Sequence, residues 1–156
     1  MTQTPSYTTR PATLNDATII CHHRNAMFAE IGHNPASVAA MDNAFGPWLQ
    51  QHMPRGEYIG WMIEDDDRRI IGGGGVWTHE GIPNTLMPHH RTAHVVNIYV
   101  EPEYRRQGIA RHIMETIIEW AKAEQIAEVT LHASREGLPL YKQLGFTSGN
   151  HMTLML

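Results

Sequence analysis

From Val100 to Arg111 the chain reads Val-Glu-Pro-Glu-Tyr-Arg-Arg-Gln-Gly-Ile-Ala-Arg, between an apolar run and an amphipathic one. The apolar run, 93–100, predicts a central strand that the proline ends. The amphipathic run, 108–125, predicts a helix, because its apolar residues recur at helical spacing. Residues 128–133 predict another strand. This half of the chain therefore predicts a β-α-β unit with two parallel strands and a right-handed crossover.

The start of the predicted helix has the chemistry of an anion site. Gly108 lets the backbone approach a ligand closely. A helix start also presents unpaired N–H groups at the positive end of the helix dipole. Although the chain has a formal net charge of −4, three arginines gather here: Arg105, Arg106 and Arg111. A phosphate or pyrophosphate ligand is the physical interpretation, and an arginine-rich helix start that only faces solvent is the alternative.

Two other phosphate motifs are absent from the sequence. There is no G-x-x-x-x-G-K-[ST] P-loop, and no G-x-G-x-x-G follows a predicted strand. Four consecutive glycines, 72–75, precede a strand segment and not a helix. They predict a bulge or close backbone packing in place of a phosphate cradle.

Further strands are predicted on both sides of this unit. They are an edge strand, the two arms of a hairpin and two short final strands: 7–12, 58–64, 70–78, Phe146 and 152–156. The edge position follows from Pro11, which cannot donate to a ladder. The charged residues 65–68 form the hairpin turn.

Further helices are predicted over about 15–31, from Asn34-Pro35 to about Gln51, and over 137–144. The first begins at a Thr13/Asp16 capping pair, and Gly145 ends the last as a left-handed cap. An interruption is expected at Gly46-Pro47. Residues 79–92 predict a long functional loop. The fold class is therefore mixed α/β or α+β.

Composition limits the possible partners and compartment. A chain of 156 residues, 42% hydrophobic and 18% charged, predicts a single folded domain over 1–156. The acidic balance argues against nucleic acid and anionic membranes, and no apolar run approaches the ~18 residues of a membrane span. The polar residues 1–10 are not expected to be a secretion signal. A single cysteine, Cys21, excludes an internal disulfide, is expected in the core and favours a cytoplasmic location.

At the quoted segment the sequence resembles the GNAT acetyltransferase superfamily. Arg105–Ala110 matches the family motif [Arg/Gln]-x-x-Gly-x-[Gly/Ala], and Asn97–Arg105 matches the strand that leads into it. Downstream, Leu131–Ser134 and Tyr141–Phe146 are similar to the family's late strand and its Tyr-x-x-x-Gly-Phe ending. The resemblance is close over roughly 93–147. It implies the GNAT fold: a mixed, mostly antiparallel sheet with a splayed parallel pair and helices on both faces.

The resemblance also implies acetyl-CoA as co-substrate and direct attack by a primary amine in a ternary complex. The acceptor would be a small molecule or a peptide or protein amine. The implied acetyl-CoA contacts fall into three groups. The strand beside the pantetheine arm contributes Ile98, Tyr99 and Val100, and Ser134 lies at the thiol end. The loop around the pyrophosphate contributes Arg105, Arg106, Gln107, Gly108, Ile109, Ala110 and Arg111.

Two residues are catalytic candidates. Tyr141 matches the family position that often protonates the leaving thiolate, and a phenol with a pKa of about 10 is a proton donor at neutral pH. Its alternative role is that of a buried aromatic packed on the last strand. Asn97 can orient a water but cannot take a proton. The general base stays open among Glu30, His79, His89, His90 and His94.

No metal is expected, although the chain has eleven histidines. Adjacent pairs such as His22-His23 diverge in both helix and strand, and there is no H-E-x-x-H. The acceptor pocket is expected from about 24–52, the 79–92 loop and the end of the chain, with Trp77 at the pocket. Two alternatives stay open: a CoA-binding sensor or interaction module without turnover, and an enzyme that uses another acyl-CoA. A homodimer is favoured because relatives are often dimers.

Overall fold

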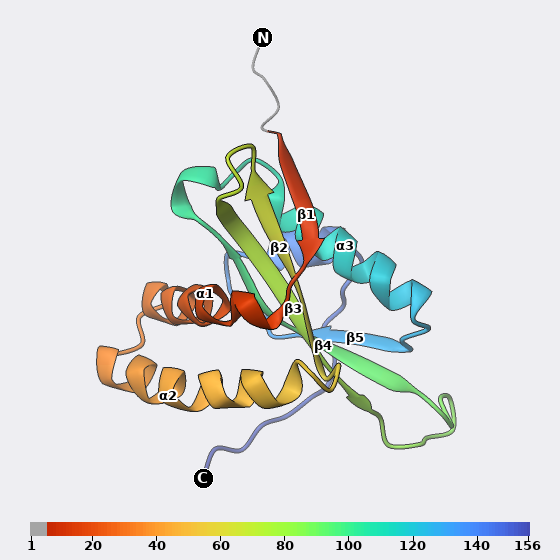
Figure 1. Cartoon of the computed structure of the whole chain (residues 1–156). Helices are drawn as coiled ribbons and strands as arrows, with labels where there is room; N and C mark the ends of the chain where they lie inside the picture. Colours follow the sequence, from red (N-terminus) through yellow and green to blue (C-terminus); the bar gives the residue numbers. More distant parts are fainter. Residues whose placement is uncertain (1–5) are drawn as a thin grey trace.

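Five strands form one mixed sheet, in the order in which they occur along the chain (Figure 1). They are β1 (Tyr7–Pro11), β2 (Tyr58–Asp65), β3 (Ile70–Glu80), β4 (Arg91–Val100) and β5 (Glu128–Leu131). Strands β1 to β4 pair antiparallel, and β4 pairs with β5 in parallel. The computed structural model describes residues 6–156. It confirms the expected mixed, mostly antiparallel sheet and places β1 at one edge.

Helices cover both faces of the sheet (Figure 1). One face carries α1 (Ala17–Glu30) and α2 (Pro35–His52), whose buried side chains cluster with Tyr58 and Met62 of β2. The other face carries α3 (Ile109–Ala123), which clusters with the alternate β2 residues Trp61 and Ile63. Strand alternation thus separates two cores. The remaining helical elements are short: η1 (Leu14–Asp16), η2 (Pro102–Tyr104) and α4 (Leu138–Gln143).

Local capping signals place the helix ends as expected. The Thr13 N–H donates to Asp16 Oδ2 at 2.7 Å in a capping box ahead of α1. The Asn34 side chain accepts from the Ser37 N–H at 2.8 Å and caps α2. Gly145, with φ +97°, follows α4 in the left-handed conformation. Each signal acts within one turn of the chain, which is why sequence alone locates it.

The expected interruption of the second helix is wrong, because α2 runs through Pro47 to His52. Proline removes one hydrogen bond, here the bond to the carbonyl of Asn43. Both Asn43 and Pro47 are exposed, so water can reach that carbonyl. The solvent side of the helix therefore tolerates the proline.

Two other expectations also differ from the structure. The loop between β3 and β4 is shorter than 79–92, because His79 and Glu80 pair with Thr92 and Arg91. The expected final strands do not form among the described residues. Phe146 instead packs its ring 6.0 Å from that of Tyr141, and the apolar side chains of the 152–156 tail are 82–114% exposed. A strand needs a neighbour to pair its backbone, and the tail has none among residues 6–156.

Candidate active site

The two parallel strands separate partway along their length. β4 and β5 pair only from Thr92 to Val95 of β4, against Glu128 to Leu131 of β5. Beyond Val95, β4 continues to Val100 while β5 has ended. One edge of β4 over 96–100 is therefore without a strand partner among the described residues, and its polar groups face an opening in the sheet.

A bulge in the same stretch of β4 redirects one side chain. The pairing with β3 shifts register between Gly73, opposite Tyr99, and Gly75, opposite Val96. Asn97 lies in the bulge with φ +60°, a conformation that asparagine tolerates better than most residues. The bulge places Val96 and Asn97 toward the same α1/α2 face, whereas strict alternation would separate them.

The glycine run of β3 packs closely against these neighbours. A Cβ on Gly74 would lie 2.5 Å from Ile98 Cδ1 and 2.7 Å from Ile113 Cγ2, and one on Gly75 would clash with the Tyr58 hydroxyl. Only glycine leaves room for the bulge of β4 and for α3 at this place. The predicted bulge and close packing are confirmed.

The loop before α3 presents a run of free amides. Gly108, with φ +81°, is the N-cap of α3, and Arg106 is also left-handed with φ +62°. In the described part of the chain, no hydrogen bond occupies the backbone N–H groups of residues 106–111. Consecutive free amides at a helix start form an anion-binding concavity. The segment therefore fits a pyrophosphate through its backbone.

The arginine side chains of this loop are mostly engaged elsewhere. Arg105 Nε donates to the Val100 carbonyl at 2.8 Å, and its Nη2 donates to both Glu30 carboxylate oxygens at 2.8 and 3.0 Å. Its guanidinium also lies 5.4 Å from the Tyr99 ring centroid. Arg111 donates to the Gln143 side chain. Arg105 thus ties the loop to β4 and α1, and Arg106 has no partner among residues 6–156.

Tyr141 and Ser134 meet around Gly137. Ser134 Oγ accepts from the Gly137 N–H at 3.1 Å, and a Cβ on Gly137 would lie 2.8 Å from the Tyr141 ring. Burial raises the pKa of the Tyr141 phenol, which keeps it protonated at neutral pH. The other implied residues, Ile98, Tyr99 and Val100, lie on the free stretch of β4. Gln107 lies in the loop before the N-cap of α3, and Ile109 and Ala110 are the first two residues of this helix.

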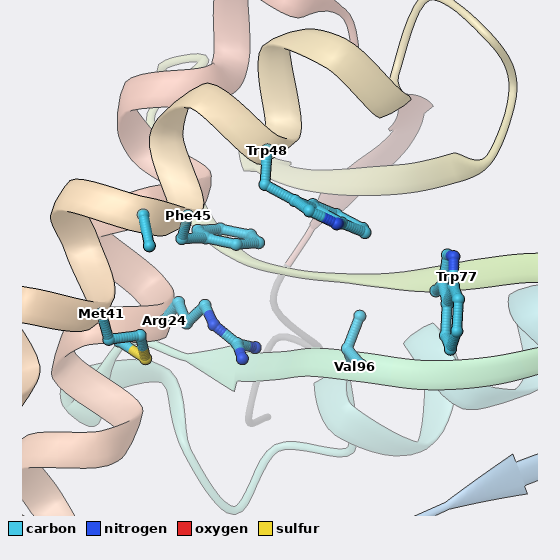
Figure 2. Close-up of a pocket in the computed structure, with 7 residues that line it drawn as sticks. Arg24, Met41, Phe45, Trp48, Trp77 and Val96 are labelled. Atoms are coloured by element: carbon cyan, nitrogen blue, oxygen red, sulfur yellow. The ribbon is translucent and has the colours of Figure 1, made fainter.

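A cavity of about 330 Å³ opens on the α1/α2 face of the sheet (Figure 2). Its lining comes from both helices and from β3 and β4: Arg24, Met41, Ala44, Phe45, Trp48, Trp77 and Val96. Val96 is the first residue of β4 beyond the pairing with β5, so the cavity borders the opening in the sheet. The helix pair and Trp77, which were expected at the acceptor pocket, line this cavity. The 81–90 loop and the end of the chain do not line this cavity.

Arg24 is a pocket residue that sequence reasoning missed. Its Nη1 donates to Asn97 Oδ1 at 2.8 Å, while Asn97 Nδ2 donates to the Tyr58 hydroxyl at 3.1 Å. The guanidinium lies 4.7 Å from the Phe45 ring centroid and 5.0 Å from that of Phe28. Asn97 is 4% exposed and holds Arg24 in place. Because His22 and His23 precede Arg24 and Asn25 follows it, the local sequence offered no signal that sets this arginine apart.

The base candidates occupy different surroundings. Glu30 is paired with Arg105. His79 Nε2 lies 3.0 Å from Thr92 Oγ1, and the His79 ring stacks on Trp77 at 4.4 Å. His94 Nδ1 lies 2.7 Å from Thr130 Oγ1, and burial lowers its pKa. His94 also pairs across the sheet with Trp77, so both His79 and His94 neighbour this residue of the cavity wall.

The remaining candidates lie outside this group. His90 forms a hydrogen bond within its own loop to the Met87 carbonyl, and His89 is exposed in the same loop. Within residues 6–156, no three His, Cys, Asp or Glu side chains are grouped as a metal site would need. None of the helices described is both long and apolar enough to span a membrane.

Comparisons with known proteins agree with this geometry. A family model described as acetyltransferase (GNAT) family matches residues 22–146. A crystal structure of a GCN5-related N-acetyltransferase from Ralstonia eutropha is 30% identical, with a TM-score of 0.89 over 97% of this chain and 99% of that chain. A predicted acetyltransferase with acetyl-CoA from Clostridium acetobutylicum is 22% identical, with a TM-score of 0.88 over 97% of this chain and 96% of that one. That second likeness concerns the fold alone.

A curated relative matches over a shorter stretch. Glucosamine 6-phosphate N-acetyltransferase from Trypanosoma brucei brucei is 26% identical over 78 residues, which cover 50% of this chain and 51% of that protein. The match thus spans about half the length of the curated relative.

Proposed function

The chain belongs to the acetyltransferase (GNAT) family, and on this premise we propose that it transfers the acetyl group of acetyl-CoA to a primary amine by direct attack in a ternary complex. One observation carries the proposal. The unpaired edge of β4, 96–100, leads within one short turn to the free amides of 106–111. An extended arm and an anionic pyrophosphate would each meet the backbone groups they need.

Acetyl-CoA supplies the acyl group already activated as a thioester. The amine nitrogen bonds to the carbonyl carbon, the carbon–sulfur bond breaks, and the ammonium proton is lost while the thiolate gains one. A strand amide near Val100 is proposed to donate to the developing oxyanion. Tyr141 is proposed to protonate the thiolate, and its raised pKa keeps the proton available.

Asn97 is proposed to hold Arg24 in position. This role is added to, or replaces, the expected role of Asn97 in orienting a bound water. Both of its side-chain groups already have partners, Arg24 and Tyr58. For the base we propose His94, because burial lowers its pKa and so favours the neutral imidazole at pH 7. A cytoplasmic location and a homodimer stay part of the proposal.

The test combines binding with turnover. Calorimetric titration with CoA measures the donor site, and thiol release from acetyl-CoA with a panel of primary amines measures transfer. We expect saturable CoA binding and amine-dependent thiol release. CoA binding without release for any amine would favour a sensor or interaction module. A preference for a longer acyl-CoA would change the proposed donor from acetyl-CoA to that acyl-CoA. Absence of CoA binding would overturn the proposal.

A further inference from the structure

Arg24 is a partly buried cation for which the described residues supply no countercharge. Its one hydrogen bond within residues 6–156 goes to the neutral amide of Asn97, and its Nε is buried without any partner there. By contrast, Arg10, Arg69 and Arg105 each pair with a carboxylate at 2.5–2.8 Å. Removing a charge from water is costly unless an opposite charge or hydrogen bonds replace the water. Arg24 therefore needs an anionic partner, and residues 6–156 do not supply one.

The cation is held in position facing the cavity. Asn97 fixes Nη1 at 2.8 Å, and the Phe28 and Phe45 rings lie 5.0 and 4.7 Å from the guanidinium carbon. Figure 2 shows the guanidinium extending from α1 toward Val96 on β4. A guanidinium held in this way is preorganised to donate to an oxyanion, since little side-chain freedom remains to be lost.

The rest of the cavity is apolar. Met41, Ala44, Phe45, Trp48, Trp77 and Val96 complete its lining. No acidic residue lines it, so a polyamine would find no countercharge there. One arginine in apolar surroundings balances one negative charge, and the second charge of a phosphate dianion would stay uncompensated.

From this geometry we propose that the acceptor is a small amino acid-like molecule, in which a primary amine, a carboxylate and an apolar side chain are joined. The carboxylate pairs with Arg24, and the apolar side chain lies among Phe45, Trp48 and Trp77. The amine then lies toward Val96, where β4 leaves β5. The cavity, at about 330 Å³, is at the small end of the range for small-molecule sites. This inference rests on the proposed acetyl transfer.

Matched amine pairs test the inference in the wild-type enzyme. Thiol release is measured with phenylalanine against phenethylamine, and with leucine against 3-methylbutylamine, which lack only the carboxylate. We expect kcat/KM to be about 10- to 100-fold higher for the amino acid of each pair, the scale of one charge-assisted hydrogen-bonded contact. Equal rates within a pair, or faster reaction of the plain amine, would overturn the inference and leave acetyl transfer intact.

Two further arms separate the other outcomes. Faster reaction of O-phosphoethanolamine than of the amino acids would replace the carboxylate by a phosphate and overturn the proposed class. If CoA binds but none of the amines supports thiol release, the result would count against the proposed function itself.

A substitution then ties the preference to Arg24. Arg24→Met keeps the length and apolar stem but removes the charge, and should reduce the preference for phenylalanine over phenethylamine to near unity. Arg55→Met, at an exposed position after α2, is the control and should keep the preference. CoA affinity by calorimetry reports whether Arg24→Met has folded. A preference that survives in folded Arg24→Met would overturn the role of Arg24.

Discussion

Tyr141 has the surroundings of a proton donor that is not already committed. Its ring packs against the α3-side core and Phe146, and no hydrogen bond within the described residues uses its hydroxyl. Burial raises its pKa, so the phenol stays protonated across neutral pH. The ring therefore has a packing role, and the hydroxyl has no partner in the part of the chain that the structure describes.

Replacing Tyr141 by phenylalanine should therefore separate chemistry from packing. General acid catalysis contributes about 10²–10⁴ in rate, so kcat for Tyr141→Phe should fall by that range. The KM for acetyl-CoA should change little, because the hydroxyl acts mainly in the transition state. Steady-state kinetics with a reactive amine measure both constants.

Tyr7→Phe is the matched control. Tyr7 lies on the edge strand β1, where its ring centroid is 5.3 Å from that of His112. Removing the Tyr7 hydroxyl should leave kcat unchanged. A kcat for Tyr141→Phe within about twofold of wild type would remove Tyr141 from the mechanism and leave water as the proton donor.

Asp16 illustrates a different residue-scale effect, on stability. It is 8% exposed, and a hydrogen bond from Arg10 is the main reason that its pKa lies below the usual value. Arg10 Nη2 lies 2.8 Å from Asp16 Oδ1. A carboxylate with a lowered native pKa stabilises the fold above its unfolded pKa of about 3.9. That contribution is lost as the pH falls through the lower native pKa.

Asp16→Asn should accordingly be destabilising at pH 7 and much less so in acid. We expect a loss of about 1.5–3 kcal/mol at pH 7, the range for hydrogen bonds to charged groups. The difference from wild type should shrink as the pH falls below about 4. Urea unfolding of both proteins at several pH values measures this, with Asp66→Asn in the exposed β2–β3 turn as control. A difference that does not change with pH would contradict the ion-pair explanation.

At the scale of elements, the junction of β4 and α3 combines two devices. The end of β5 leaves one edge of β4 free, and the bulge at Asn97 lies in the pairing of β4 with β3. The left-handed Gly108 is the N-cap of α3, whose first amides are open. The strand would meet an extended arm and the helix start an anion. Their separation by one short turn makes them a single site.

Gly108→Glu should abolish CoA binding while the fold survives. A Cβ at this position meets nothing within 4 Å, so packing is not disturbed, but the carboxylate would lie where the pyrophosphate is proposed. We expect an affinity loss of at least about 100-fold by calorimetry, since like charges in contact cost several kcal/mol. Circular dichroism should be unchanged.

Gly32→Glu provides the control for backbone strain. Gly32 also has a positive φ, +95°, and open space around its Cβ, but it follows α1. Its substitution should carry a similar strain cost and leave CoA affinity intact. Equal loss of affinity in the two variants would attribute the effect to strain, and unchanged affinity in Gly108→Glu would remove the loop from the CoA site.

For the molecule as a whole, the sheet divides two cores of different character. The α3 side is closed, with Ile113, Met114 and Ile117 at 0% exposure. The α1/α2 side is less tightly closed, because Arg24, Trp48 and Trp77 surround the cavity. The proposed acceptor site thus lies on the face opposite the closed core, with the unpaired edge of β4 between them.

The C-terminal tail stands outside both cores. Its apolar side chains are 82–114% exposed. Deletion of residues 151–156 should therefore change the melting temperature of the monomer by no more than about 2 °C, because changes at the surface usually alter stability by about 0.5 kcal/mol or less. Ile117→Ala, in the closed core, should cost about 2–5 kcal/mol and serves as the comparison. Thermal unfolding at several protein concentrations, with mass by light scattering, measures both. A large, concentration-dependent loss on deleting the tail would instead show that it is buried between copies.

Sequence by itself determined the features that depend on near neighbours. The capping box of Thr13 and Asp16, the Asn34 cap, the left-handed Gly145 and the 3.6-residue repeat of α3 each act within a turn or two. The loop proposed to bind the anion belongs to this class, because its chemistry comes from consecutive backbone amides. That is why residues 93–147 were enough to predict the family and to propose the donor region.

Only the tertiary structure decided the acceptor side. Arg24, Phe45, Trp77 and Val96 come from four elements, and their meeting depends on how α1 and α2 pack on the sheet. The continuity of α2 through Pro47 and the absence of tail strands likewise depended on solvent access and on available partners. Whether a side chain is paired or left without a countercharge is a property of its neighbours in space, and a single sequence does not specify those neighbours locally.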